Sequence, residues 1–341
     1  MTSHVSISVS GALGRITLNR PEAINALSRE MIDAIAATLT GWALDHSIGA
    51  VVIDGAGPKG FCAGGDVRAA RAMVLAGDAE AADAYFAAEY RMNALIATYR
   101  KPLAALTHGV VMGGGIGIAG HCSFRLTVPG ARFAMPESAI GFFADVGVNS
   151  VLAKAPLNRA LLFLLSGVTI GAADAVELGL VDGVVAADRR EALIADLAVA
   201  AGDSHPADAI GRVVAAELIE PGPADFCALA DQVAGASRDL TAFLASVASV
   251  PALADVDAAL RGRCPASLAA TYLAQLAARR HMDIHRTLAG DLRLASLMAR
   301  RADFAEGVRA VLVDKDQRPA WSPATLADLD LAPFESALET A

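Results

Sequence analysis

The chain has 341 residues, a length that allows one large domain or two. Its 28 lysine and arginine residues against 37 aspartate and glutamate residues give a formal net charge of −9, which argues against a protein that binds nucleic acid or anionic membranes through a basic face. Apolar residues make up 55% of the chain, so it can bury a sizeable core and is too apolar to be disordered.

The first half of the chain alternates strand-like and helical segments. Short apolar runs bounded by glycine, proline or charge predict strands at residues 16–18, 50–54, 103–107, 124–128 and 180–185. Ser28 precedes apolar residues at helical spacing and is expected to cap a helix. Two further helices, Arg159–Leu165 and Ala172–Leu178, are expected to stop at the glycines that follow them.

Beyond residue 186 the pattern changes to long alanine-rich helical stretches. Prolines interrupt these stretches at positions 206, 221, 223, 251 and 265. No internal repeat or low-complexity linker is visible. The sequence therefore predicts an α/β N-terminal part and a mainly helical C-terminal part.

One segment, Pro102–Phe124, contains no charged residue and is long enough to cross a bilayer. Its six glycines each cost about 1 kcal/mol relative to alanine in a helix, so buried core or active-site backbone is the better interpretation. The N-terminal residues lack the basic and apolar regions of a secretory signal, and we expect a cytoplasmic protein without a membrane partner. The four cysteines are scattered and are expected to be free thiols.

Two motifs that often indicate a dinucleotide site or a metal site are weak evidence in this chain. Gly115–Gly120 satisfies the dinucleotide pattern G-x-G-x-x-G, with Glu137 about 20 residues on. Two more glycines precede it, however, and Pro136 blocks the strand end that would present a ribose-binding acid. His281 and His285 are four residues apart and would share a face of one helix, but no third metal ligand is apparent.

Two glycine-rich loops point to chemistry, because each follows a strand-like run. They are residues 61–66 and 112–115. Two backbone N–H groups that converge on one oxygen form an oxyanion hole, although two tight turns would need the same glycines. Further along, Glu137 and Asp145 lie in an otherwise apolar stretch, where carboxylates are costly unless paired or used. A surface loop is the alternative.

Five ordered segments resemble the crotonase (enoyl-CoA hydratase/isomerase) superfamily. They are ITLNRPEAINALS, VVIDGAGPKGFCAGGD, KPLAALTHGVVMGGGIG, RFAMPESAIGFFADVG and AADAVELGLVDGVV. The FCAGGDVR and MPESAIGFFADVG segments, with FAEGVRAVLVDKDQRPAWSPATL near the C-terminus, are most similar to the 3-hydroxyisobutyryl-CoA hydrolase branch. The resemblance implies an α/β fold, the crotonase (ClpP-like) spiral of β-β-α turns, over residues 1–200. A helical C-terminal region with a hydrolase-like tail would occupy residues 201–341.

The resemblance also implies residue roles. The N–H groups of Gly65 and Gly114 would hold the thioester carbonyl oxygen. Glu137 matches the glutamate that hydratases and hydrolases share, Asp145 falls on the hydrolase acid, and Glu89 matches a further acid of the substrate site. Residues near the coenzyme A moiety would be Arg20, Ala23, Ala26, Ala63, Gly64 and Asp66.

The chain departs from the family pattern at two places. Gly117 stands where hydratases carry a second catalytic glutamate, which disfavours enoyl hydration. The hydrolases usually continue F-P-D-V-G-G-G around Asp145, whereas this chain has Ala144 before it and Val148-Asn149 after it. That change puts the acyl specificity in question.

The resemblance therefore implies an acyl-CoA thioester hydrolase, with 3-hydroxyisobutyryl-CoA, a compound of valine degradation, as the expected substrate. The alternatives are an enoyl-CoA hydratase or isomerase and an acyl-CoA-binding protein that has lost catalysis. Coenzyme A would be part of the substrate, and no metal or other cofactor is expected. The partners would be the acyl-CoA and further copies of the chain, in a trimer or hexamer.

Overall fold

The computed structural model describes residues 4–234 and 239–339 and contains two compact units. Unit 1 comprises Met1–Gly65, Arg91–Phe133 and Ile170–Ala224, and unit 2 comprises Asp66–Tyr90, Ala134–Thr169 and Asp225–Ala341. Each unit is assembled from three separate segments of the chain. The sequence analysis instead divides the chain once, into residues 1–200 and 201–341. That division remains a prediction.

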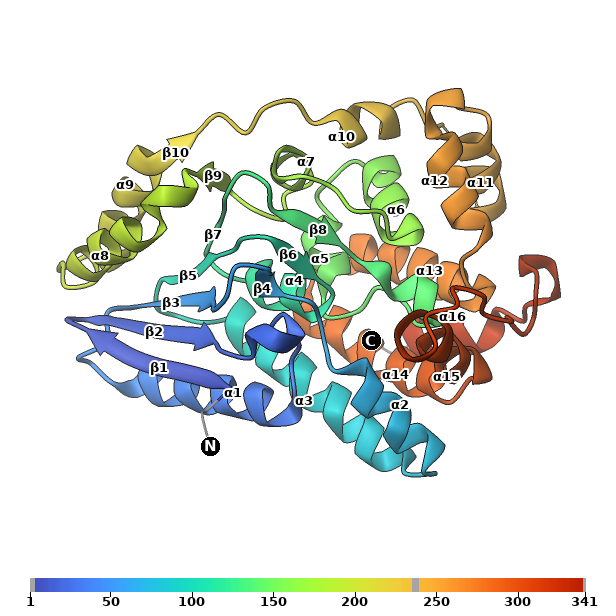
Figure 1. Ribbon diagram of the computed structural model, residues 1–341, viewed down its shortest axis with the longest axis horizontal. Helices are drawn as coiled ribbons and strands as arrows, with labels where there is room; N and C mark the ends of the chain where they lie inside the picture. The colour runs from blue at the N-terminus through green and yellow to red at the C-terminus, as the bar shows by residue number, and fades with distance from the viewer. Residues whose placement is uncertain (1–3, 235–238, 340–341) are drawn as a thin grey trace. The chain divides into compact units, whose positions relative to one another are not determined.

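A seven-stranded sheet forms the centre of unit 1 (Figure 1). In spatial order its strands are β1 (Val5–Ser10), β2 (Leu13–Leu18), β3 (Ala50–Gly55), β5 (Leu103–Leu106), β7 (Phe124–Thr127), β9 (Gly183–Val185) and β10 (Leu218–Ile219). Neighbours from β2 to β9 are parallel, and β1 and β10 pair antiparallel at the two edges. Every residue of β3 is buried, as expected for a central parallel strand covered on both faces.

A second sheet of three strands alternates with the first along the chain. Its strands are β4 (Gly60–Cys62), β6 (Val110–Met112) and β8 (Arg132–Ala134). Each follows a strand of the larger sheet, so that β3 leads to β4, β5 to β6 and β7 to β8. This alternation is the expected spiral of β-β-α turns. What repeats is the pairing of backbone strands, which does not require the same side chains in each turn. The sequence therefore shows no internal repeat.

Most predicted elements of unit 1 are confirmed. Helix α1 (Arg29–Leu44) begins directly after Ser28, whose hydroxyl oxygen accepts a hydrogen bond from the Met31 N–H. The strand expected at 180–185 is shorter, because Leu180 donates its N–H to Ala175 of helix α7 (Ala172–Glu177) and leaves only β9 extended.

The core of unit 1 lies between one face of the large sheet and two helices, α8 (Arg190–Ala200) and α9 (Pro206–Glu217). Pro206 begins α9, and Pro265 likewise begins a helix of unit 2. Proline is favoured at the first helical position because its missing N–H has no partner there, so these prolines start helices as well as interrupting them. Buried residues of this core include Leu13, Val52, Leu106, Leu126, Val185, Leu193, Leu197 and Ile210.

Unit 2 is mainly helical, as expected for the C-terminal part of the chain. Its helices are α2 (Val67–Leu75), α5 (Val148–Leu152), α6 (Leu157–Ser166), α10 (Asp225–Ala230), α11 (Leu240–Ala248), α12 (Ala254–Arg261), α13 (Pro265–His281), α14 (Ile284–Ala299), α15 (Ala302–Val308) and α16 (Ala332–Glu339). Helix α3 (Ala79–Ala97) belongs to unit 2 up to Tyr90. Apolar residues of α6, α10, α11, α12 and α13 form a second core; they include Leu161, Leu165, Phe243, Val247, Leu260 and Leu268.

The charge-free segment Pro102–Phe124 forms β5, β6 and helix α4 (Gly114–Ala119). All six residues of α4 are buried, so the expectation of core backbone is confirmed. Among the described residues no single helix has the length and apolar character of a membrane span. One sharply bent pair, α11 followed by Pro251–Arg261, meets the criterion by length and composition alone.

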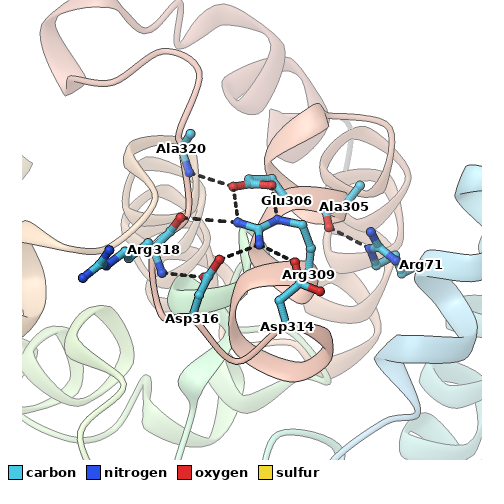
Figure 2. Close-up of polar contacts among 8 residues, drawn as sticks. All are labelled: Arg71, Ala305, Glu306, Arg309, Asp314, Asp316, Arg318 and Ala320. Atoms are coloured by element: carbon cyan, nitrogen blue, oxygen red, sulfur yellow. Dashed lines mark hydrogen bonds and ion pairs between the residues drawn. The ribbon is translucent and has the colours of Figure 1, made fainter.

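An arginine organises the hydrolase-like C-terminal segment (Figure 2). Arg309 begins a π-helical turn, η5 (Arg309–Val313), and its guanidinium donates to Glu306 at 2.8 and 2.9 Å. It also donates to Asp314 at 2.6 Å and to Asp316 at 2.7 Å. Glu306 in turn accepts the Ala320 N–H at 3.0 Å. Planar, multidentate pairing of this kind fixes geometry, so the network holds the loop after η5 against α15.

Helix α15 approaches a 3₁₀ turn, η2 (Pro136–Ile140), backbone to backbone. A Cβ atom added to Gly307 would lie 2.3 Å from the carbonyl carbon of Ile140. Likewise, a Cβ atom added to Gly141, which follows η2, would lie 2.1 Å from the carbonyl oxygen of Asp303 in α15. Only glycine permits this approach, which places the C-terminal segment directly against the turn that carries Glu137.

The substitution Gly307→Ala should therefore lower the free energy of unfolding by about 1–3 kcal/mol, because the added methyl group overlaps the Ile140 backbone. Gly41→Ala is the matched control, since Gly41 is also helical and no atom lies within 4 Å of its added Cβ. It should raise stability by about 0.5–1 kcal/mol. Urea denaturation of both variants measures the difference, and equal stabilities would contradict the close approach.

Candidate active site

The two glycine-rich loops of unit 1 lie side by side, because each follows one of two neighbouring parallel strands, β4 and β6. Gly64 has φ +106° and Gly113 has φ +48°, values that favour glycine. A Cβ atom on Gly64 would lie 3.6 Å from the Gly114 nitrogen. The two loops are therefore adjacent in unit 1.

The N–H groups of Gly65 and Gly114 make no hydrogen bond to any other described residue. Gly114 is the first residue of α4, where the N–H has no acceptor in a preceding turn. Two donors from adjacent loops are the parts of an oxyanion hole. Their role in holding a carbonyl oxygen stays a prediction.

The residues expected near coenzyme A fall into two groups. In unit 1 the loop containing Arg20, Ala23 and Ala26 joins the loop containing Ala63 and Gly64. The Ala63 N–H donates to the Ile24 oxygen, and the Leu27 N–H donates to the Gly64 oxygen, both at 2.9 Å. Asp66 belongs to unit 2, where its carboxylate caps α2 by accepting the Ala69 N–H.

Asn25 was not identified from the sequence, although it holds this pair of loops together. Its side chain is fully buried, and Nδ2 lies within 3.1 Å of the carbonyl oxygens of Ala56, Gly60 and Phe61. Its Oδ1 accepts the Arg20 N–H at 2.8 Å. An asparagine between apolar neighbours in ITLNRPEAINALS is the signal that could have revealed it.

Three predicted acids of unit 2 gather in one buried cluster. Glu89 comes from α3, Glu137 from η2, and Asp145 from the loop before α5. Their exposed fractions are 3%, 8% and 6%. The surface-loop alternative for Glu137 and Asp145 is therefore wrong, because both lie inside unit 2 among apolar residues.

Burial and mutual repulsion raise the pKa values of these carboxyls. Burial, reinforced by the charge of Asp145, raises the pKa of Glu89 to about 8. The same two causes, with a smaller contribution from Glu89, raise the pKa of Glu137 well above its usual range. Burial also raises the pKa of Asp145, but the hydrogen bond from Tyr90 opposes that rise. Asp145 is thus the acid best able to carry a charge, and Glu137 retains a proton longer.

Two further residues of this cluster were missed by the sequence reasoning. The Tyr90 hydroxyl donates to Asp145 Oδ2 at 2.6 Å. Asp291 of α14 is 1% exposed and accepts the Gly147 N–H at 2.8 Å. Tyr90 follows Glu89 directly in the sequence, but nothing in the sequence connects Asp291 to a residue 144 positions away.

The departures around Asp145 form a consistent local structure. Ala144 donates its N–H to Thr271 Oγ1 at 3.1 Å, which a proline at that position could not do. Asn149 donates its side-chain amide to the Ala144 oxygen at 2.7 Å. Val148 and Asn149 are buried in α5, where the family's glycines would favour the helix less. The substituted residues thus fix the loop rather than loosen it.

Other sequence motifs have no site role that the structure supports. Gly117 lies buried in α4, so no carboxylate occupies that position. His281 ends α13 and His285 lies in α14, so the assumption that they share one helix is wrong. Met282 has φ +50° and breaks the helix between them. In residues 4–234 and 239–339 no group of three or more His, Cys, Asp or Glu side chains could hold a metal ion.

Comparisons with known proteins agree on the family. The family model for enoyl-CoA hydratase/isomerase matches residues 13–338. The 3-hydroxyisobutyryl-CoA hydrolase of Danio rerio is 35% identical over 339 residues, covering 95% of this chain and 86% of the relative. The human protein of that name is 34% identical over 337 residues, with the same coverage.

Solved structures are similar over the whole chain. A carnitinyl-CoA dehydratase from Mycobacterium thermoresistibile has a TM-score of 0.89 at 32% identity, covering 99% of this chain and 96% of that one. An enoyl-CoA hydratase from Rhodobacter sphaeroides has the same TM-score at 33% identity, covering 99% and 97%.

The expectation of a cytoplasmic protein is contradicted by these comparisons, since the Danio rerio and human relatives are both named as mitochondrial proteins. The expectation depended on the lack of a readable secretory signal. That feature bears on secretion and does not distinguish between compartments inside the cell.

The raised pKa of Glu89 predicts a pH-dependent stability. Above about pH 4 the unfolded chain releases this proton, whereas the folded protein retains it until about pH 8. The free energy of unfolding therefore falls as pH rises through that window. Glu89→Gln removes the titration, so its stability relative to the parent should be about 1–3 kcal/mol greater at pH 8 than at pH 5.

Denaturant unfolding at the two pH values measures this difference. Glu80→Gln, at the exposed start of the same helix, controls for the substitution itself. A Glu89→Gln variant whose relative stability is the same at both pH values would rule out a proton held by Glu89.

Proposed function

Because the chain belongs to the enoyl-CoA hydratase/isomerase (crotonase) family, we propose that it is an acyl-CoA thioester hydrolase whose substrate is 3-hydroxyisobutyryl-CoA. The observation that carries the proposal is the buried cluster of Glu89, Glu137 and Asp145, together with glycine at position 117. A cluster of acids with raised pKa values is suited to proton transfer near neutral pH. The reaction would be a step of valine degradation.

In this proposal the N–H groups of Gly65 and Gly114 hold the thioester carbonyl oxygen. Negative charge develops on that oxygen when the carbonyl carbon is attacked, and each donor lowers the barrier by about 2.7–4 kcal/mol. The loops can serve this purpose because their backbone is fixed by β4, β6 and Asn25 and needs no rearrangement.

Glu137 supplies the proton chemistry. As a general base it takes a proton from water while the water oxygen bonds to the carbonyl carbon. The C–S bond then breaks, and the proton passes to the leaving sulfur. As a nucleophile its carboxylate oxygen bonds to the carbonyl carbon and the C–S bond breaks, which leaves a mixed anhydride and the coenzyme A thiolate. Water then hydrolyses the anhydride, and the proton it releases passes to the thiolate. Both routes need ionised Glu137, so hydrolysis should rise with pH as the coupled carboxyls lose their protons.

Asp145 and Glu89 are proposed to bind the acyl part of the substrate. An ionised Asp145, held by Tyr90, can accept a hydrogen bond from the substrate's hydroxyl group. Glu89 lines the same cluster and retains a proton near neutral pH, so it can donate one. No metal or other cofactor is part of this mechanism, since coenzyme A belongs to the substrate.

The main alternative is an enoyl-CoA hydratase or isomerase. The two solved structures with a TM-score of 0.89 are named as a hydratase and a dehydratase, which favours it. Gly117 opposes it, because only one of the two hydratase glutamates is present. A protein that only binds acyl-CoA is disfavoured by the intact acid cluster. Assembly into a homo-oligomer, a trimer or hexamer, is part of the proposal by resemblance.

Glu137→Gln should lower kcat for thiol release from 3-hydroxyisobutyryl-CoA by about 10²–10⁴-fold, because glutamine can neither take a proton nor attack. Release is followed with a thiol reagent while enone absorbance is recorded on a panel of acyl-CoA esters. Glu220→Gln, on an exposed loop of unit 1, is the control. Full activity of Glu137→Gln removes its assigned role. Enone loss without thiol release in the unsubstituted protein selects the hydratase alternative.

Asp145→Asn keeps an oxygen for the Tyr90 hydroxyl but loses the charge that would bind the substrate hydroxyl. The loss in kcat/KM should therefore be about 10-fold or more larger for 3-hydroxyisobutyryl-CoA than for isobutyryl-CoA. Steady-state kinetics on the two esters provides the test. Equal losses would exclude Asp145 from hydroxyl recognition.

A further inference from the structure

A buried carboxyl outside the proposed chemistry, Asp291, supports the loop that carries Asp145. Asp291 lies midway along α14 and is 1% exposed. Its Oδ2 atom accepts the Gly147 N–H at 2.8 Å. Burying a carboxyl is costly unless its interactions offset the lost hydration, so this contact has structural or functional value.

The two residues after Asp145 adopt a backbone conformation that is unfavourable unless other parts of the protein stabilise it. Val146 has φ +54° and Gly147 has φ +74°, so two consecutive residues are left-handed. A β-branched residue rarely adopts such a φ, and conformations of this kind persist only where the surroundings enforce them. The turn sends the chain directly from Asp145 into α5, where the Val148 N–H donates back to the Asp145 oxygen at 3.1 Å.

Asp145 is therefore held at three points. Tyr90 of α3 fixes its carboxylate, Val148 of α5 fixes its carbonyl oxygen, and Asp291 of α14 fixes the turn that follows it. The bond from Val148 closes the turn over Val146 and Gly147, whose positive φ values are those of a hydrogen-bonded turn. The bond to Asp291 adds a constraint from outside the turn, because it fixes the direction of the Gly147 N–H.

We propose that Asp291 is a positioning residue for Asp145: it stabilises the left-handed turn Val146–Gly147 and thereby sets where the Asp145 carboxylate meets the substrate. This deepens, and rests on, the proposed function. It acts through hydrogen-bond acceptance, and its charge is not needed.

The surroundings of Asp291 disfavour a charge on it. Burial and the charge of Asp145 raise its pKa well above the usual range, and the hydrogen bond from the Gly147 N–H opposes that rise. The ionisable groups that interact with it are Asp145 on the loop and Tyr90 on α3, and His281 and Arg286 line with it a small cavity between α13, α14 and α16. That cavity has a volume of about 10 Å³, which is room for one water molecule. Such a water can accept a hydrogen bond from the protonated Asp291 carboxyl.

Two substitutions separate acceptance of the hydrogen bond from charge. Asp291→Asn keeps a carbonyl oxygen for the Gly147 N–H, and its kcat, kcat/KM and pH profile should stay within about 3-fold of the parent. Asp291→Ala leaves that N–H buried without an acceptor. It should lower kcat/KM about 10–100-fold for 3-hydroxyisobutyryl-CoA and clearly less for isobutyryl-CoA, reproducing the pattern of Asp145→Asn. Asp83→Ala is the matched control, since Asp83 joins α3 to Arg300 beyond the end of α14 and lies outside the acid cluster.

A double-mutant cycle tests whether Asp291 acts through Asp145. Adding Asp291→Ala to Asp145→Asn should cause little further loss, because the group to be positioned is already absent. Fully additive losses would overturn the proposal, as would an Asp291→Asn variant that is as impaired as Asp291→Ala or has a shifted pH profile. A loss in Asp83→Ala equal to that in Asp291→Ala would show a general effect of weakening α14.

Hydrogen exchange distinguishes failure of this inference from failure of the proposed function. In Asp291→Ala the amides of residues 144–149 should exchange at least 10-fold faster than in the parent, whatever reaction the protein catalyses. Unchanged exchange overturns the positioning role. A parent protein that releases no thiol from any ester of the panel would overturn the proposed function, while the exchange measurement would still decide whether Asp291 supports the turn.

Discussion

Four carboxyl groups buried together are the constraint on which the rest of unit 2 depends. Glu89, Glu137, Asp145 and Asp291 are all buried, with exposed fractions between 1% and 8%. Like charges in a medium of low polarity cannot all ionise, so most of these groups retain protons and the remaining charge rests where hydrogen bonds favour it. Tyr90 provides such a bond to Asp145. The cluster therefore exists at a cost in stability that grows with pH, which is the usual sign of residues retained for chemistry.

Helices of the long C-terminal region contact the loops that carry the buried acids. Helix α14 supplies the acceptor for Gly147, helix α13 supplies Thr271 to Ala144, and α15 packs its glycine against the turn that carries Glu137. The Arg309 network fixes the segment that continues from α15. The region after residue 225 thus supports the acid cluster from several sides. Loops with strained backbone need this support, because their own local preferences would favour other conformations.

The substitutions at Ala144, Val148 and Asn149 show how a departure from a family pattern can be compensated locally. The N–H gained at Ala144 finds an acceptor in Thr271, and the amide gained at Asn149 binds the Ala144 oxygen. The two new donors, the Ala144 N–H and the Asn149 amide nitrogen, therefore have acceptors inside the protein, whereas Asn149 Oδ1 is buried without a hydrogen-bond partner among the described residues. The backbone around Asp145 is therefore fixed by contacts that this chain supplies itself.

The acidic composition argues against binding of nucleic acid or anionic membranes through a basic face. The chain's local patterns determined most elements of secondary structure, because hydrophobic periodicity and capping act between neighbouring residues. The sequence also singled out Gly65, Gly114, Glu89, Glu137 and Asp145, through ordered motifs that resemble a known family. It did not reveal Asn25, Tyr90 or Asp291 as parts of these sites, and it placed His281 and His285 on one helix that Met282 divides. Those features depend on contacts between distant segments, such as the one between Gly147 and Asp291. Only the tertiary structure decides them, because burial and hydrogen bonding between segments far apart in the chain leave no local pattern.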